Sequence, residues 1–592
     1  MEGFIKGGAF LIESISPVLV FMPENFTEEH RLIAKAAIDF VVGEVQPVID
    51  DIETQKEGLL PGLLKKAGEL GLLSSDIAEE DGGQGLDMVS SILIAEKMAW
   101  GGSSFSVTYG VQTGIGSLPI VFFGNRDQKR RYLPKIATAE KIGAYALTEP
   151  GAGSDALNAK TTAILSPDGK YYILNGQKQF ISNAGFADLF ITYAKVDGEK
   201  FTAFIVDRNS EGVSVDEEEK KLGIKGSSTR SVIFNDVEVP VDNVLGEVGR
   251  GHVVAFNILN VGRFKMGGGC LGSSKMAIQD AVNYAKQRVQ FGRSISEFGM
   301  IKRKIAEMAI RTFTMESMVY RTAGLIDQML HQIDRHAEDS GAQMAKGIEE
   351  YAIEDSINKV YTSEMLDYIV DEALQIFGGY GYVQDYPAER HYRDSRITRI
   401  VEGTNEINRL LIVDMLIKRA MENRVPILQA GQRVVDELRT FRPRVEIDDE
   451  TLTLQKEMIE MAKRLVLIVM SGAVQKFTKR FAEEQEVLAL ISDMVIEVYA
   501  MESALLRALK SSERGEDGES QIQKAMVKAY TSDTFDKVES LAKQALAAIT
   551  DGNTLETYFT TLGKLTRFRP VNTVLLKRQI ADATLRMGRY PF

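Results

Sequence analysis

The feature of this sequence that most restricts its fold is a long stretch without proline. No proline occurs between Pro240 and Pro387. Because proline disrupts the interior of a helix, a gap of this length is typical of long helices. Within it, apolar residues at helical spacing predict helices over 277–288, 301–329, 343–361 and 363–377. Long helices joined by short connections favour a helical bundle.

The regions before and after this bundle have different patterns of apolar residues. Residues 26–144 are predicted to be mostly helical, whereas short alternating apolar runs between turn residues predict a β domain from 145 to 246. Pro426, Gly431 and Pro443 indicate a linker, and a helical region follows. We therefore predict a mainly α fold with a central β domain. Its expected parts are a helical domain (1–144), a β domain (145–247), a four-helix bundle (248–422) and an additional helical domain (430–592).

Composition excludes several classes of function. With 70 Lys+Arg against 83 Asp+Glu, the net charge of -13 argues against general nucleic-acid binding, which depends on a basic surface. The single cysteine, Cys270, excludes an internal disulfide and a cysteine-based zinc site, and we predict no metal site. The longest apolar run, residues 465–474, is too short for the roughly 20 residues that cross a bilayer. We find no export signal and expect a cytoplasmic protein.

One segment raises the alternative of a peripheral membrane contact. Basic residues interleave with apolar ones in the order Arg433, Val434, Val435, Leu438, Arg439, Phe441, Arg442 and Arg444. An amphipathic segment of this kind is compatible with a membrane surface, and at least as compatible with an ordinary packed helix. We favour the packed helix.

Nucleotide-binding motifs do not explain this chain. Residues 267–272 match the GxGxxG motif. A dinucleotide-binding turn follows a strand, however, and the residues before this motif have a helical pattern. We interpret these glycines as small residues that allow close helix packing. A nicotinamide or ATP enzyme is therefore disfavoured.

Three other sequence features are compatible with ligand binding or catalysis. A loop of small and hydroxyl residues at 145–155 offers backbone N–H groups to a polar ligand, and glycines at 378–381 allow close approach of a flat one. Glu402 follows the apolar Val401, and desolvation raises the pKa of such a carboxyl toward that of a general base. Taken singly, each feature is more often an ordinary turn, a helix end or a solvated glutamate.

Together and in this order, these segments resemble the acyl-CoA dehydrogenase family. The resembling stretches are YALTEPGAGSDA (145–156), LNGQKQFISNAGFADLF (174–190), KKLGIKGSSTRSVIFNDVEVP (220–240), QRVQFG (287–292), QIFGGYGY (375–382) and RIVEGTNEINR (399–409). They cover about residues 30–420. The helical extension and the opening KGGAFL (6–11) resemble the very-long-chain branch, whose members carry a fourth, helical domain.

The resemblance implies an FAD enzyme and assigns roles to single residues. It gives FAD contacts to Tyr145, Leu147, Thr148, Gly153, Ser154, Phe180, Ser182, Arg288, Phe291, Gln375, Gly379, Thr404 and Glu406. Of these, Arg288, Phe291, Gln375 and Gly379 would serve the FAD of a partner subunit. By the same resemblance, the C-terminal domain would cover a surface that other members use to form tetramers, which leaves a homodimer. The resemblance gives acyl-CoA contacts to Ser154, Asn260, Arg263 and Gly403.

The implied reaction begins with Glu402 removing the α-proton of an acyl-CoA. FAD takes the β-hydride, trans-2-enoyl-CoA forms, and electrons pass to an electron-transfer flavoprotein in fatty-acid β-oxidation. One family subset places its base on a bundle helix instead. Here the matching place is close to Gly262, which favours Glu402. Phe180 replaces the tryptophan of many members.

The resemblance leaves the substrate and the acceptor to be distinguished. Small residues, Val401 with Gly110, Gly114 and Gly116, suggest room for a long acyl chain. We favour a long- or very-long-chain acyl-CoA dehydrogenase over two alternatives. These are an acyl-CoA oxidase, which passes electrons to O₂, and a flavin-bearing binding protein without catalysis.

Overall fold

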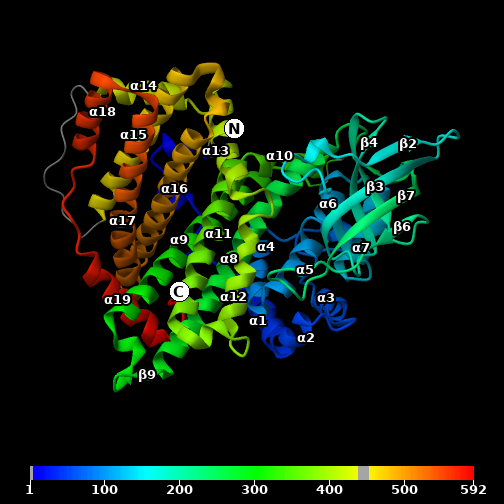
Figure 1. Ribbon diagram of the computed structural model, residues 1–592, viewed down its shortest axis with the longest axis horizontal. Coiled ribbons are helices and arrows are strands. Elements are labelled where there is room, and N and C mark those ends of the chain that lie inside the picture. The colour runs from blue at the N-terminus through cyan, green and yellow to red at the C-terminus, as the bar shows by residue number, and fades with distance from the viewer. Residues whose placement is uncertain (1–4, 336, 338, 438–451, 516) are drawn as a thin grey trace.

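The computed structural model describes residues 5–335, 337, 339–437, 452–515 and 517–592. The described chain is mainly helical, with a β region of eight strands between two helical regions (Figure 1). The predicted fold class is therefore confirmed. The β region projects to one side of the helices, and the C-terminal helices lie on the opposite side of the molecule (Figure 1).

The first region consists of short helices. They are α1 (Glu28–Phe40), α2 (Ile49–Glu53), α3 (Leu59–Glu69), α4 (Met88–Met98), α5 (Ser103–Thr113), α6 (Leu118–Phe123) and α7 (Arg126–Ala137). Helix α4 packs against the bundle, whereas α5 contacts the first and third strands of the sheet. Helix α5 therefore joins the β region to the helical regions.

The β region forms a sheet of eight strands. They are β1 (Gly143–Ala146), β2 (Thr162–Leu165), β3 (Tyr171–Ser182), β4 (Leu189–Val196), β5 (Lys200–Asp207), β6 (Val213–Val215), β7 (Thr229–Pro240) and β8 (Val244–Leu245). Their order is β6-β7-β3-β2-β4-β5-β8, with β1 parallel to β4. The register of β3 against β7 shifts between Lys178 and Ile181, which marks a bulge at Phe180.

The helices of the bundle region differ greatly in length, and only some are longer than expected. They are α8 (Gly251–Gln287), α9 (Gly299–Leu330), α10 (Ser340–Glu349), α11 (Ala352–Phe377), α12 (Pro387–Ser395) and α13 (Asn405–Met421), with the hairpin β9 (Val289–Gln290) and β10 (Arg293–Ser294) after α8. The expected break at residue 362 is wrong, because α11 runs through it with Thr362 and Ser363 buried. The GxGxxG glycines lie inside α8, so their interpretation as helix-packing residues is confirmed.

The C-terminal region is helical throughout its described part. It contains α14 (Ile427–Glu437), α15 (Thr453–Phe477), α16 (Gln485–Glu513), α17 (Gly518–Ile549), α18 (Gly552–Leu565) and α19 (Thr573–Met587). The expected linker at Pro426 and Gly431 is wrong, because α14 begins at residue 427. A Cβ at Gly431 would overlap Ser471 on α15, so the glycine allows the two helices to approach closely.

A buried cluster of charges joins this region to the bundle. Lys275 on α8 contacts Glu96 at 2.9 Å and also pairs with Glu316 on α9. Arg507 on α16 contacts Glu316 at 2.6 Å, and the Tyr590 hydroxyl donates to Glu316 at 2.7 Å. Because buried charges need their partners, this cluster fixes where the C-terminal helices dock.

No helix among the described residues is both long and apolar enough to span a membrane. Of the amphipathic segment, Arg433 is exposed and Val434 is buried on α14, which is the pattern of a packed helix. Leu438, Arg439, Phe441, Arg442 and Arg444, together with Pro443, lie outside the described residues.

Candidate active site

Glu402 lies in a short loop just before α13. Its backbone φ is +57° and that of Gly403 is +78°, so two successive residues adopt the left-handed conformation. Thr404 ends this turn as the N-cap of α13, with its hydroxyl accepting from the Ile407 N–H at 3.3 Å. A left-handed glutamate is strained, and the surrounding contacts must hold it.

Buried donors hold the carbonyls of this loop. Arg263 Nε donates to the Glu402 carbonyl at 3.0 Å, and Lys359 Nζ donates to the Gly403 carbonyl at 2.8 Å. Asn408 Nδ2 donates to the Gly403 and Thr404 carbonyls at 2.9 and 3.0 Å. Three consecutive carbonyl groups therefore point into the protein, and the opposite side of the loop faces the site.

The Glu402 carboxylate is not paired. Its Oε2 is buried and finds no hydrogen-bond partner within the described part of the chain. Burial raises the pKa of Glu402 to about 7, while the charges of Arg263 and Lys359 limit the rise. A buried carboxyl with a free oxygen and a pKa near neutrality can accept a proton from a ligand.

Gly262 on α8 faces this carboxylate. A Cβ at position 262 would lie 2.6 Å from Glu402 Oε2 and 2.8 Å from Cδ. The bundle-helix position considered as an alternative place for a base therefore lies against Glu402 itself. A side chain at either position excludes one at the other.

Asn260 and Arg263, expected to contact CoA, are both buried on α8. Arg263 Nη1 donates to Asn260 Oδ1 at 2.8 Å, which orients the guanidinium toward the Glu402 carbonyl. Gly403, also expected at the substrate, lies in the same loop. Glu406 is exposed in the first turn of α13. The structure thus gathers these residues around Glu402.

A second group of expected residues surrounds the loop after β1. Tyr145 lies within β1, and its hydroxyl donates to the Ala255 carbonyl of α8 at 3.5 Å. Burial raises the pKa of Tyr145 well above its usual value, and the charge of Glu402 adds to the rise. The loop after β1 therefore lies on the same side of α8 as the carboxylate. Leu147 is buried, Thr148 is half-buried, and Gly153 and Ser154 are exposed.

Strand β3 contributes an aromatic ring to this group. Phe180 lies at the bulge with φ +59°, and its side chain is 58% exposed. Ser182 ends the strand and is half-buried. An exposed phenylalanine on a strained backbone is unfavourable unless a flat, apolar surface covers it.

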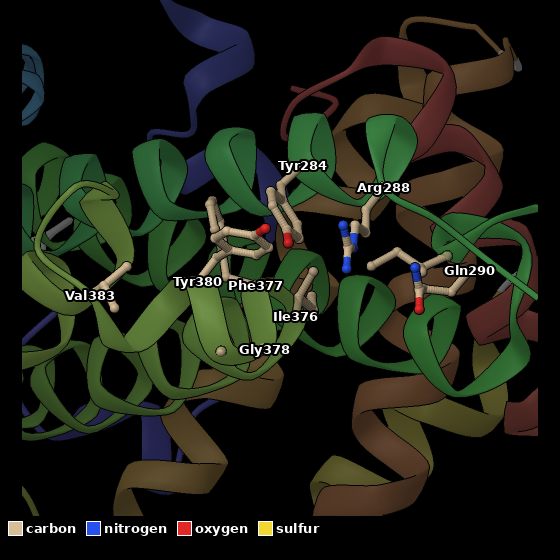
Figure 2. A pocket seen from close by; sticks show the side chains of 10 residues that line it. Tyr284, Arg288, Gln290, Ile376, Phe377, Gly378, Tyr380 and Val383 are labelled. Carbon is tan, nitrogen blue, oxygen red and sulfur yellow. The ribbon is translucent and has the colours of Figure 1, made fainter.

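The third group lies around the β9–β10 hairpin. A cavity of about 570 Å³ has Arg288, Gln290 and Gly379 in its lining. Figure 2 shows the Arg288 side chain beside Tyr284. The Arg288 guanidinium lies 5.5 Å from the centre of the Tyr380 ring.

Two further residues of this group are exposed. Phe291 has φ +53° and is 94% exposed, and Gln375 is exposed outside the cavity lining. The hairpin lies far from the β sheet (Figure 1). Within one chain, the expected cofactor residues therefore fall into two separate places.

Sequence reasoning missed several residues of the site. Lys359 and Asn408 hold the Glu402 loop, and Lys178 holds the loop after β1. Lys359 lies close to the apolar Ile357 and Val360 in the sequence, whereas Lys178 is flanked by Gln177 and Gln179. Only Lys359 therefore has an apolar sequence setting. A lysine in a buried element is an available signal, because such a charge requires a partner.

Profiles of known families match most of the chain. Those described as the acyl-CoA dehydrogenase N-terminal, middle and C-terminal domains match residues 27–140, 144–237 and 249–417. A further profile, also described as an acyl-CoA dehydrogenase C-terminal domain, matches residues 461–564.

Individual proteins agree with these profiles. The chain is 49% identical over 586 residues to the "Probable acyl-CoA dehydrogenase" of Bacillus subtilis (strain 168), covering 99% of this chain and 98% of that protein. It is 36% identical over 494 residues to the mitochondrial very long-chain specific acyl-CoA dehydrogenase of Rattus norvegicus, covering 79% and 72%.

A solved structure agrees over nearly the whole length. The crystal structure of an acyl-CoA dehydrogenase complexed with FAD from Bacillus anthracis superposes with a TM-score of 0.97. It is 49% identical and covers 99% of this chain and 100% of that one. This chain therefore belongs to the acyl-CoA dehydrogenase family of oxidoreductases and includes the family's additional C-terminal domain.

Proposed function

We propose that this protein is an FAD-dependent dehydrogenase of long- or very-long-chain acyl-CoA that acts in fatty-acid β-oxidation. The observation that carries the proposal is the buried Glu402 Oε2, which lacks a partner among the described residues in a loop that buried donors hold. A free carboxylate oxygen in a fixed and desolvated position is what α-proton abstraction requires.

The residues fit FAD. The exposed Phe180 ring offers a flat apolar surface beside the loop after β1, where an isoalloxazine ring would stack. Tyr145, Leu147, Thr148, Gly153, Ser154 and Ser182 would line the same flavin, with Thr404 and Glu406 next to the base. The acyl-CoA dehydrogenase of Bacillus anthracis is complexed with FAD, which supports the same cofactor here.

The chain's own residues account for the proton chemistry. Glu402 would take the α-proton of the acyl thioester, and the thioester oxygen would gain negative charge. No acceptor among the described residues engages the Glu402 backbone N–H, so it remains available to stabilise that oxygen. Ser154, Asn260, Arg263 and Gly403 would position the acyl-CoA. Bound FAD supplies the acceptor for the two electrons and hydrogen that leave the β-carbon.

Open space between α5 and α8 supports a long acyl chain. A Cβ at Gly110 on α5 would meet no atom within 4 Å, and one at Gly269 on α8 would meet only Ser106 Oγ, at 3.8 Å. The expectation is wrong for Gly114 and Gly116, because a Cβ there would lie 2.6 and 2.8 Å from backbone carbonyl oxygens. Small residues on two facing helices leave room for a narrow apolar ligand. This observation favours a long chain over a short one.

The partners follow from the divided site. The β9–β10 hairpin, which follows Arg288 and contains Phe291, lies far from the β sheet (Figure 1), and Gly379 lines the same cavity as Arg288. A homodimer in which each chain completes the site of the other uses both groups. We further propose that an electron-transfer flavoprotein accepts the electrons and that the protein is cytoplasmic.

Anaerobic mixing with acyl-CoAs tests this function. A series of saturated acyl-CoAs of increasing length should bleach the yellow wild-type protein, most strongly with the long chains. Glu402→Gln should keep FAD and acyl-CoA binding but reduce its flavin about a thousandfold more slowly. Flavin reduction at the wild-type rate in Glu402→Gln would contradict the assignment of Glu402 as the base.

The same experiment separates the alternatives. Rapid reoxidation of the bleached protein in air, without an added acceptor, would identify an oxidase. No bleaching with any acyl-CoA, despite bound FAD, would identify a binding protein without catalysis.

A further inference from the structure

Lys178 is a fully buried lysine in strand β3, and its side chain contacts the loop after β1. Its Nζ donates to the Leu147 carbonyl at 3.2 Å and lies 2.7 Å from Glu149 Oε1. The proton abstraction proposed for Glu402 does not involve this ion pair. Both partners are nonetheless adjacent to residues assigned to FAD.

Glu149 is held from several sides. Its Oε1 accepts from the Thr161 N–H at 3.0 Å and from the Thr161 hydroxyl at 2.5 Å, and its Oε2 accepts from the Lys160 N–H at 2.5 Å. Burial opposes the charge on Glu149, but Lys178 and these hydrogen bonds keep the pKa of the carboxyl below its usual range. The loop after β1 is therefore tied to the start of β2 as well as to β3.

The pair also determines where the backbone of this loop points. The Leu147 carbonyl faces Lys178, and the Thr148 carbonyl accepts from the Gln179 N–H at 2.9 Å. In a trans peptide the N–H points away from the carbonyl of the same unit. The Thr148 N–H, which shares its peptide unit with the Leu147 carbonyl, therefore points away from Lys178. It finds no acceptor within the described residues.

A buried ion pair is a costly way to join a loop to a strand. Apolar side chains of similar volume often give equal or greater stability at such sites. Burial lowers the pKa of Lys178 to about 8, which reflects the cost of keeping its charge away from water. A pair that contributes little to net stability is better explained by the position it gives to the loop.

We propose that Lys178 and Glu149 are positioning residues for the flavin. They orient the backbone of Leu147 and Thr148 so that the Thr148 N–H is directed at the FAD ring. This inference rests on the proposed placement of FAD against residues 145–154. It assigns no catalytic step to either side chain.

FAD affinity of the apoprotein tests the proposal, because this measurement needs no acyl-CoA. Lys178→Met should raise the Kd for FAD at least tenfold and shift the visible absorption bands of the bound flavin. The matched control is Lys200→Met, which removes an exposed lysine whose Nζ lies 2.9 Å from Asp197 in the same β region. The control should leave both readouts unchanged.

A double variant separates positioning from stability. Lys178→Met leaves Glu149 buried without its cation, whereas Lys178→Met with Glu149→Gln removes both charges. The double variant should recover much of the thermal stability lost in the single one. Its FAD affinity should stay low, because neither variant has a donor for the Leu147 carbonyl.

Two results would overturn the inference. One is an unchanged FAD Kd in Lys178→Met, and the other is an FAD affinity that the double variant restores to the wild-type value. Failure of the proposed function would look different, because the wild-type protein would then bind FAD without being bleached by acyl-CoA.

Discussion

At the scale of single residues, the site depends on backbone groups as much as on side chains. A left-handed conformation costs Glu402 about 1 kcal/mol, and Arg263, Lys359 and Asn408 offset this cost through the loop carbonyls. The strain has a consequence for chemistry. It places the carboxylate against Gly262 with Oε2 buried, and this burial raises the pKa of Glu402.

The raised pKa predicts the pH dependence of flavin reduction. Glu402 must be ionised to accept a proton, and its pKa is about 7, so kcat/KM should rise with pH and reach half of its maximum near pH 7. Lys359 lowers this pKa through its charge, so Lys359→Met should move the half-maximum to higher pH. Stopped-flow reduction at a series of pH values measures both. A midpoint that stays in place or falls in Lys359→Met contradicts the assignment.

The absence of a side chain at position 262 gives a second prediction. A Cβ there would lie 2.6 Å from Glu402 Oε2, so Gly262→Ala must displace the carboxylate. Displacing a base by about 1 Å can slow a reaction about a hundredfold, and we expect this loss in flavin reduction.

Gly563→Ala is the control for Gly262→Ala. It lies within α18 of the C-terminal region, where a Cβ meets no atom within 4 Å. The control should keep its rate and gain up to about 1 kcal/mol of stability, because alanine favours a helix over glycine. Equal rates in the two variants would show that Glu402 is not confined by α8.

At the scale of elements, the N-terminal segment 5–11 joins the bundle to the C-terminal helices. The Gly7 N–H donates to Glu350 Oε1 at 3.1 Å, and Arg419 Nη1 donates to the Gly7 carbonyl at 2.5 Å. Phe10 packs edge-on against Tyr499 of α16, with ring centres 4.9 Å apart. The segment therefore fills the space between α11, α13 and α16.

Gly7 has no room for a side chain in this packing. A Cβ would overlap the Glu350 carbonyl oxygen and the Arg419 guanidinium. Gly7→Ala should therefore destabilise the protein by about 2 kcal/mol, seen as a lower midpoint of thermal unfolding. Gly62→Ala is the control, because a Cβ on α3 at that position meets no atom within 4 Å. A midpoint that is unchanged in Gly7→Ala would mean that the segment is not tightly packed.

Sequence patterns predicted most elements but not their ends or their interruptions. Apolar spacing predicted a helix at 301–329, where α9 lies, and short alternating apolar runs predicted the β domain that contains the eight-stranded sheet. It wrongly divided α11 at Thr362 and Ser363, since the Ser363 hydroxyl donates to the Val360 carbonyl within the helix instead of ending it. The prediction of a linker at the position of α14 was also wrong, because Gly431 allows close packing of α14 against α15.

The candidate site was predictable only in part, for a similar reason. The motif around Glu402 is local in sequence, so resemblance placed it directly. Lys359 lies 44 residues from Gly403, and Lys178 lies 31 residues from Leu147. Contacts of this kind depend on how elements meet in three dimensions, and no local pattern specifies them.

At the scale of the whole molecule, the expected FAD residues lie in two distant places. Glu402, the loop after β1 and Phe180 form one group, and Arg288 with Gly379 lines a cavity near the β9–β10 hairpin (Figures 1 and 2). Exposure of Phe291 at 94% is unfavourable for a lone chain, and a partner subunit would cover it.

Subunit complementation tests this arrangement. Arg288→Glu should abolish FAD binding in a homodimer, because the partner's cofactor loses its cation, and Glu402→Gln should abolish proton abstraction. In a dimer with one chain of each kind, one site receives both defects. The other site combines an intact Glu402 with an intact Arg288 from the opposite chain, so it should function.

Coexpression of the two variants with different tags allows the mixed dimer to be purified. It should show about half of the wild-type turnover per dimer, since one of two equivalent sites is intact. Each variant purified alone provides the control and should be inactive. An inactive mixed dimer would mean that Arg288 and Glu402 act at the same site from one chain. That result would contradict the proposal that residues near the β9–β10 hairpin, which lies far from the β sheet in Figure 1, complete the site of the partner subunit.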